Sequence, residues 1–166
     1  MKSRIVLLNA FLGLSFVGVV LALYALAHET GRLTGGVCDI NATFNCDVVN
    51  RGPYGNVGGV PVALIGVIGY AFFALAAFLK RRDVHDRHLS LFLLAAVSGG
   101  VLFTLYLTGV EAFVLHTWCL VCLCSQAVIL SLFGLSLAVF LGERLESRAA
   151  QAKEILEEAA DELKEL

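Results

Sequence analysis

Five cysteines are the residues best suited to chemistry in this chain, and four of them form two spaced pairs. Cys119 and Cys122 are three residues apart in Trp118-Cys-Leu-Val-Cys, at the start of a long apolar run, and Cys38 and Cys46 are eight residues apart. On a helix that begins at Trp118, the two later thiols lie one turn apart on one face, close enough for a disulfide. A helix N-terminus also stabilises a thiolate. The spacing alone leaves open a redox pair, half of a zinc site or a static clip.

The amino-acid composition indicates which class of protein carries these thiols. Hydrophobic residues make up 58% of the 166 residues and charged residues 16%, with a mean hydropathy of +0.83. A soluble domain of this size cannot bury so much apolar surface. Spanning a bilayer takes roughly 20 apolar residues, and the runs of that length are Ile5–Ala27, Val60–Leu79, Leu89–Val110 and Trp118–Leu141. We therefore expect an all-α membrane protein with a four-transmembrane-helix bundle over residues 1–141, followed by an amphipathic helical tail over 142–166.

The distribution of basic residues predicts the orientation of this bundle. Cytoplasmic loops are enriched in lysine and arginine, and ten of the twelve basic residues fall on one side of the expected spans: Lys2, Arg4, Lys80, Arg81, Arg82, Arg87, Arg144, Arg148, Lys153 and Lys164. We expect both termini and the tail in the cytosol of a multi-pass protein of the cell (inner or plasma) membrane. A long outer loop then joins the first two spans, and the cysteine pairs lie on the extracytoplasmic side. The net charge of −2 argues against a nucleic-acid partner.

Cysteine pairs confined to an outer face have three interpretations. They are two static disulfides, a four-cysteine zinc site, or a relay in which a mobile loop pair exchanges electrons with a helix pair. Zinc is disfavoured because seven residues separate Cys38 from Cys46. The relay uses every placement, and an oxidising compartment permits it. Asp39 and Asp47 follow the loop cysteines and disfavour their thiolates, so the helix pair is expected to be the stronger oxidant and electrons to run from loop to helix.

Several segments together resemble the vitamin K epoxide reductase family, most closely its bacterial and archaeal members. They are Cys38 with Cys46, Asp47-Val-Val-Asn followed by Pro53-Tyr54, Gly59-Val-Pro-Val-Ala-Leu-Ile-Gly66, and Trp118-Cys119 with Cys122. The resemblance covers about residues 5–141. It implies a four-helix bundle around a quinone (menaquinone or ubiquinone) and a role in disulfide formation analogous to that of DsbB. Because this chain has a plain helical tail, the partner is expected to be a separate thioredoxin-fold (DsbA-like) protein.

The resemblance also implies residue roles. Cys38 forms the mixed disulfide with the partner, Cys46 passes electrons to Cys119, and Cys122 reacts with the quinone. The candidate quinone-binding residues are Asn50, Tyr54, Val62, Trp118 and Gln126, with His116 as a candidate proton donor and no metal.

The chain departs from the family pattern at three positions. Gly52 stands where a serine is common, Val62 where the vertebrate enzyme has asparagine, and Gln126 where it has tyrosine. These departures favour plain quinone reduction over epoxide reduction. Cys124 lies about 200° around the helix from Cys122, and we expect a buried, inert thiol there. The alternatives are a quinone or vitamin K epoxide reductase that uses a soluble thiol donor, and a non-enzymatic scaffold braced by disulfides.

Overall fold

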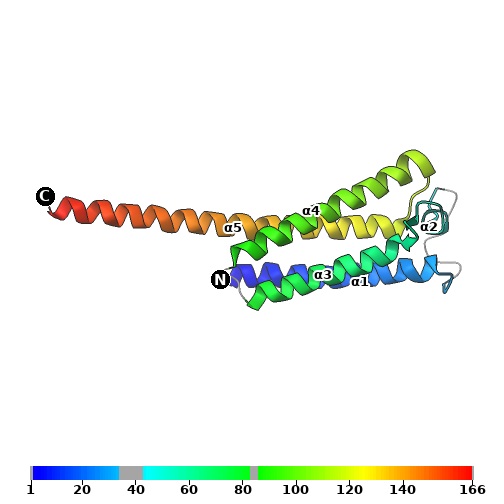
Figure 1. Ribbon diagram of the computed structural model, residues 1–166, viewed down its shortest axis with the longest axis horizontal. Coiled ribbons are helices and arrows are strands. Elements are labelled where there is room, and N and C mark those ends of the chain that lie inside the picture. Colours follow the sequence, from blue (N-terminus) through cyan, green and yellow to red (C-terminus); the bar gives the residue numbers. More distant parts are fainter. Residues whose placement is uncertain (1, 34–42, 83–85, 166) are drawn as a thin grey trace.

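Four long helices dominate the computed structural model, which describes residues 2–33, 43–82 and 86–165 (Figure 1). They are α1 (Lys2–Glu29), α3 (Val62–Arg82), α4 (Arg87–Val110) and α5 (Leu120–Glu165). Each of the four is long and apolar enough to cross a membrane. The expected all-α architecture with four spans is therefore confirmed.

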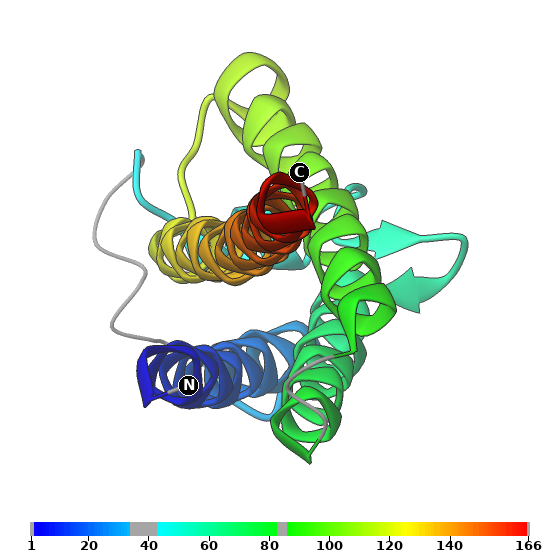
Figure 2. The same cartoon turned by 90° about the vertical axis from the view of Figure 1, so that its left-hand side faces the viewer.

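The helices form a bundle in which α1 packs against α3 and α5, and α5 also packs against α4 (Figure 2). The core is aromatic and aliphatic, with Phe11, Tyr70, Phe73, Leu93, Val97, Ile129 and Leu132 among its buried members. Gly18 allows α1 to approach α3, because a Cβ at this position would collide with the Tyr70 ring. The Tyr70 hydroxyl donates to the backbone oxygen of Ser125 at 2.9 Å, which ties α3 to α5.

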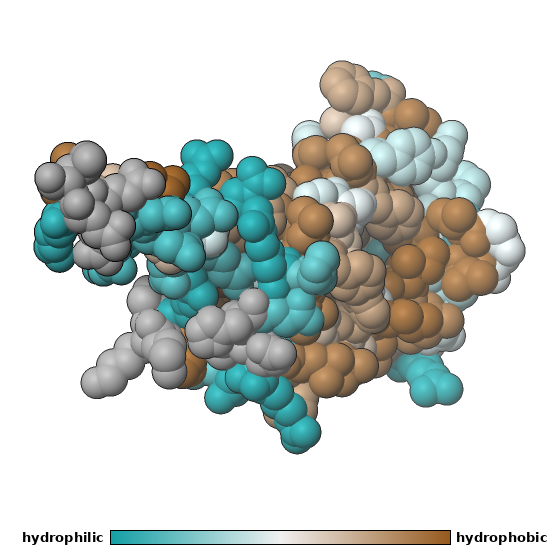
Figure 3. All heavy atoms as spheres, turned by 60° about the vertical axis from the view of Figure 1, so that its left-hand side comes forward, coloured by the Kyte–Doolittle hydropathy of each residue, from teal (hydrophilic) through white to brown (hydrophobic). Residues whose placement is uncertain are grey.

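The outer surface of the bundle is largely apolar. Hydrophobic side chains cover it, and hydrophilic ones gather where the tail leaves the bundle (Figure 3). Exposed side chains such as Phe16, Ile68 and Leu102 face the surroundings, as expected for contact with lipid. Cys124 is also exposed, so the prediction of a buried thiol is wrong. The inward face of α5 runs through Cys122 and Ile129, and a position about 200° away must therefore point outward.

A buried ionic cluster joins α3, α4 and α5 at the tail end of the bundle. Lys80 is fully buried, and its Nζ lies 2.9 Å from Oε1 of Glu143. Ser90 Oγ donates to the same carboxylate oxygen at 2.8 Å, and Lys80 Nζ also donates to the backbone oxygen of Asp86. The cluster offsets the cost of burying these charges.

The connection between α1 and α3 carries more regular structure than the sequence suggests. Helix α2 (Cys46–Asn50) begins after Asn45, whose side-chain oxygen accepts the Val48 N–H. A hairpin of two short strands follows, β1 (Asn56–Val57) and β2 (Val60–Pro61). We expected only a long outer loop here, with Val60 already in the second span. The strands form because Gly58 and Gly59 adopt positive φ values of 61° and 83°, the conformation that a tight hairpin turn requires.

The connection from α4 to α5 is partly a π-helix, η1 (Glu111–Leu115), that continues α4 directly. Helix α5 then starts at Leu120, two residues later than expected, and runs without a break into the tail. Most of the link between the third and fourth expected spans, residues 111–117, is therefore helical.

Candidate active site

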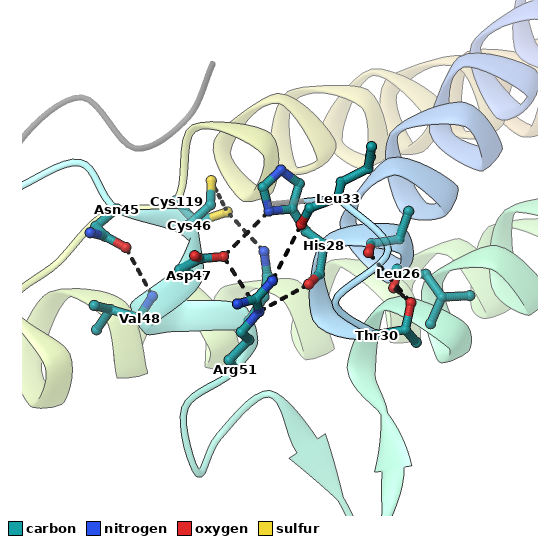
Figure 4. Close-up of polar contacts among 12 residues, drawn as sticks. Leu26, His28, Thr30, Leu33, Asn45, Cys46, Asp47, Val48, Arg51 and Cys119 are labelled. Carbon is teal, nitrogen blue, oxygen red and sulfur yellow. Dashed lines mark hydrogen bonds and ion pairs between the residues drawn. The ribbon is translucent and has the colours of Figure 1, made fainter. Parts of the chain in front are cut away.

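Two cysteines from distant parts of the chain meet at the end of the bundle away from the tail. Sγ of Cys46 lies 3.1 Å from Sγ of Cys119, and the two residues are 1% and 0% exposed (Figure 4). Cys46 is in a disulfide, whereas Cys119 and Cys122 are free thiols. A thiol sulfur this close to a disulfide sulfur is placed for thiol–disulfide exchange. The partner that we expected for Cys46, Cys38, lies outside the described residues.

Backbone pairing holds the two sulfurs together. Phe44 and Trp118 form a parallel bridge, in which the Asn45 N–H donates to the Trp118 oxygen at 3.1 Å. The Trp118 N–H donates to the Thr43 oxygen at 2.8 Å. These bonds fix the segment before Cys46 against the segment before Cys119, so the contact between the sulfurs follows from main-chain geometry.

A polar clamp, which we define as His28, Asp47 and Arg51, attaches α2 to the end of α1 (Figure 4). Oδ1 of Asp47 lies 3.3 Å from Nδ1 of the buried His28 and 3.5 Å from Nε of Arg51. Arg51 Nε also donates to the backbone oxygen of His28 at 3.0 Å. The clamp satisfies a helix-end carbonyl of α1 and fixes the residue that follows Cys46.

Cys119 occupies the position that caps helix α5. Its backbone oxygen accepts the Leu123 N–H at 3.0 Å, and its Sγ accepts the Cys122 N–H at 3.3 Å. The pKa of the Cys119 thiol is lowered, chiefly by hydrogen bonding from the Cys122 thiol and then by backbone N–H groups. Burial and the nearby Glu111 carboxylate oppose this shift without reversing it. Cys119 is therefore the better nucleophile of the helix pair near neutral pH.

A mostly apolar cavity of about 190 Å³ opens beside Cys122, between the outer halves of all four long helices. The small residues Ala63, Gly66 and Gly69 form a stripe within its lining on α3. Stripes of small residues usually serve helix packing. Gly66 does contact α1 through Ala22, but a Cβ at Gly69 would meet nothing within 4 Å. The lack of larger side chains along this stripe therefore leaves space for the cavity.

Three of the five candidate quinone-binding residues line this cavity: Asn50, Val62 and Gln126. Nδ2 of Asn50 lies 4.0 Å from Sγ of Cys119. Both side-chain polar atoms of Gln126 are buried and have no hydrogen-bond partner among the described residues. Buried polar groups are normally paired, so the Gln126 amide is suited to bind a ligand in the cavity.

The other candidates lie elsewhere. Tyr54 is 41% exposed and lies in the turn before the hairpin. Trp118 forms the backbone bridge to Phe44. Neither Tyr54 nor Trp118 belongs to the lining of the cavity. His116 is exposed and ends the π-helix with a left-handed backbone, φ 52°. The binding roles of Tyr54 and Trp118 and the proton-donor role of His116 stay predictions.

Glu111 is a site residue that the sequence analysis missed. Only 3% of it is exposed, its Oε2 accepts the Cys119 N–H at 3.1 Å, and it lines the cavity with Cys122. The signal available in the sequence was a single carboxylate directly after an apolar span. Ionisable residues at membrane depth often mark function, but this one resembled part of a surface link.

The family comparison agrees with this geometry. The model of the vitamin K epoxide reductase family matches residues 9–137, which is most of the chain and includes all five cysteines. A search of curated proteins finds no significant match. The four apolar helices and the cysteine centre at one end of the bundle provide the same arrangement that the motifs suggested. The chain therefore belongs to the vitamin K epoxide reductase family of membrane oxidoreductases.

Proposed function

We propose that this protein is a thiol–quinone oxidoreductase that drives disulfide formation in exported proteins. It takes two electrons from the dithiol of a separate thioredoxin-fold (DsbA-like) protein and transfers them to a membrane quinone. The observation that carries the proposal is the distance of 3.1 Å between Sγ of Cys46, which is in a disulfide, and Sγ of the free Cys119. Thiol–disulfide exchange requires this kind of approach.

The relay proceeds in two exchange steps. A Cys46 thiolate attacks Sγ of Cys119 in an oxidised Cys119–Cys122 couple, so the Cys46–Cys119 bond forms and Cys122 leaves as a thiolate that takes up a proton. A Cys38 thiolate then attacks Sγ of Cys46 and releases Cys119. Two electrons have now moved from the loop couple to the helix couple. The free thiols of Cys119 and Cys122 match the end state of these two exchange steps.

The donor side of the relay rests on the family resemblance. In this proposal Cys38, which lies outside the described residues, forms the mixed disulfide with the partner. The partner loses two thiol hydrogens and becomes a disulfide, and the loop couple becomes a dithiol.

The cavity beside Cys122 fits the quinone that the family uses. Its lining is mainly apolar, as a prenylated ring requires, and the unpartnered Gln126 amide supplies both a donor and an acceptor. Gln126 and Asn50 would hold the ring carbonyls, and the apolar wall of Val62 and Ile65 would exclude water. A bound quinone accepts two electrons and two protons and becomes a quinol. Menaquinone and ubiquinone present the same ring dicarbonyl to these residues.

The sidedness of the reaction follows from the basic residues. Ten of the twelve lie at the termini, in the link between α3 and α4 or in the tail, and these parts share the end of the bundle opposite the sulfurs. The positive-inside rule then puts both termini and the tail in the cytosol and the cysteines on the extracytoplasmic side. Partner proteins that pass through an oxidising compartment would meet them there.

The unpaired helix thiols also favour the relay over a static scaffold. Two bracing disulfides would need all four outer cysteines paired, but Cys119 and Cys122 are free.

Reconstitution with a reduced thioredoxin-fold protein and a quinone tests the proposal. We expect loss of quinone absorbance that depends on the dithiol. Cys122→Ser should reduce the rate to background, because the second electron-donating sulfur is gone. Cys124→Ser is the matched control on the same helix and should keep the full rate, since that thiol faces outward. Turnover by Cys122→Ser at the parent rate, or none by the folded parent protein, would contradict the relay.

A further inference from the structure

One buried ionisable group at the active site has no role in the relay described above. Glu111 is 3% exposed and makes no ion pair within the described ranges. An isolated carboxylate at membrane depth is costly and is retained mainly where it functions. Its position therefore needs an explanation beyond packing.

Glu111 continues the cavity-facing side of α4. Thr104, Leu107 and Thr108 line the cavity seven, four and three residues before it, the spacings that place residues on one face of a helix. The π-helix η1 begins at Glu111, and π-turns often occur at functional sites. The Glu111 backbone oxygen accepts the Thr117 N–H at 3.2 Å, which closes the link onto α5.

The carboxyl group lies between the helix cysteines and the cavity. Oε2 accepts the Cys119 N–H at 3.1 Å, and the side chain also interacts with the Cys122 thiol. Glu111, Cys122 and Gln126 all line the same cavity. The titratable groups that face this carboxyl from α5 are the two thiols. A proton can therefore pass from sulfur to carboxyl to cavity without crossing bulk water.

We propose that Glu111 is the catalytic acid–base group that carries protons between the helix thiols and the acceptor bound in the cavity. This inference rests on the proposed quinone reduction. Oxidation of the Cys119–Cys122 dithiol to a disulfide releases two electrons and two protons, and a quinone takes up two of each. The Glu111 carboxylate removes the proton from Cys122 as the S–S bond forms and delivers it to one ring oxygen of the acceptor. The second proton, lost by Cys119 when it becomes a thiolate, reaches the other ring oxygen through the same carboxyl group.

Glu111→Gln separates this role from a structural one. The glutamine side-chain oxygen still accepts the Cys119 N–H, but the amide cannot exchange the proton. Loss of a positioned acid–base group typically costs about 10²–10⁴-fold, so we expect kcat for quinone reduction to fall by at least about 100-fold, with KM for the quinone unchanged. Exchange between a reduced partner and the loop couple should continue at the parent rate. Glu29→Gln, at the same end of the bundle but outside the cavity lining, is the matched control and should keep full activity.

A second readout needs no quinone. Reduction of the Cys119–Cys122 disulfide by dithiothreitol should change the carbonyl stretch of a carboxylic acid in the infrared difference spectrum, and this band should be missing in Glu111→Gln. Full quinone turnover by Glu111→Gln, or an unchanged band in that variant, would overturn the inference. If the parent protein reduces no quinone, the proposed function fails, but the infrared band still decides whether Glu111 exchanges a proton with the thiols.

Discussion

At the scale of single residues, the clamp of His28, Asp47 and Arg51 controls where Cys46 lies. Asp47 follows Cys46 directly, and its carboxylate contacts one cationic side chain and one buried imidazole. From the sequence alone, Asp47 was a charge that disfavours the neighbouring thiolate. The structure pairs that charge with Arg51, so the residue also acts as an attachment point for α2.

We expect Asp47→Ala to slow the exchange between the sulfurs. Misplacement of a reacting group by about 1 Å can cost up to about 100-fold, and the substitution removes the carboxylate contacts to His28 and Arg51 that attach α2 to α1. The measurement is the rate at which a Cys46–Cys119 disulfide forms in a Cys122→Ser background, followed by alkylation and non-reducing electrophoresis. Val48→Ala, an exposed neighbour on α2, is the control. Equal rates for Asp47→Ala and its parent would mean that the clamp does not position Cys46.

The sequence analysis selected the cysteines because their spacing is itself the chemical signal. It also selected Asn50, Val62 and Gln126, which line the cavity, and their binding roles stay predictions. It missed Glu111, because the expected span ended at Val110 and the carboxyl counted as part of the link, although it lies seven residues after the cavity-lining Thr104, on the same face of the helix. Cys124 was misjudged for a related reason: its angle to Cys122 was known, but not which face of α5 is buried.

At the scale of elements, the cluster of Lys80, Ser90 and Glu143 fixes three helices relative to one another. It is far from the sulfurs, and Lys80 Nζ and Glu143 Oε1 are only 2.9 Å apart with both side chains buried. Breaking a buried pair leaves an uncompensated charge, whereas removing both partners together is often tolerated.

Lys80→Met should lower the free energy of unfolding by about 3–5 kcal/mol, because the Glu143 carboxylate is left unpaired. The double variant Lys80→Met/Glu143→Leu should recover most of that loss. Arg81→Met removes the same charge from an exposed neighbour and should stay within about 0.5 kcal/mol of the parent. Titration with a denaturing detergent in mixed micelles measures the free energy of unfolding of all three variants. A single variant as stable as the parent would show that the pair does not hold the helices.

Helix positions followed closely from apolar run length, since each run of about 20 residues must satisfy its own backbone in lipid. The hairpin could not be predicted in this way, because its strands are only two residues each and its turn depends on the positive φ angles of Gly58 and Gly59. The start of α5 shifted to Leu120 because Trp118 pairs with Phe44 before the helix begins.

At the scale of the whole molecule, the two ends of the bundle differ in chemistry. The sulfurs, α2 and the hairpin gather at one end, and both termini leave from the other (Figure 1). The distribution of basic residues predicts that the end with both termini faces the cytosol.

Introduced cysteines would make that assignment. Asn56→Cys, on the exposed β1 strand, should react with a membrane-impermeant maleimide in intact cells. Gln151→Cys, on the exposed tail, should react only after the membrane is permeabilised. Each labelled fraction is compared with that of the parent chain, which corrects for native thiols. The opposite labelling pattern would reverse the proposed orientation.

The unbroken α5 also sets a distance. Its residues 148–165 extend past the ion pair between Arg4 and Glu146 as a continuous helix, which at 1.5 Å per residue is a rod roughly 27 Å long. A reporter fused to the end of this helix would sit at the tip of the rod, with the whole bundle between it and the reactive sulfurs. A fluorescent protein or affinity tag attached there should leave the docking face for a redox partner unobstructed.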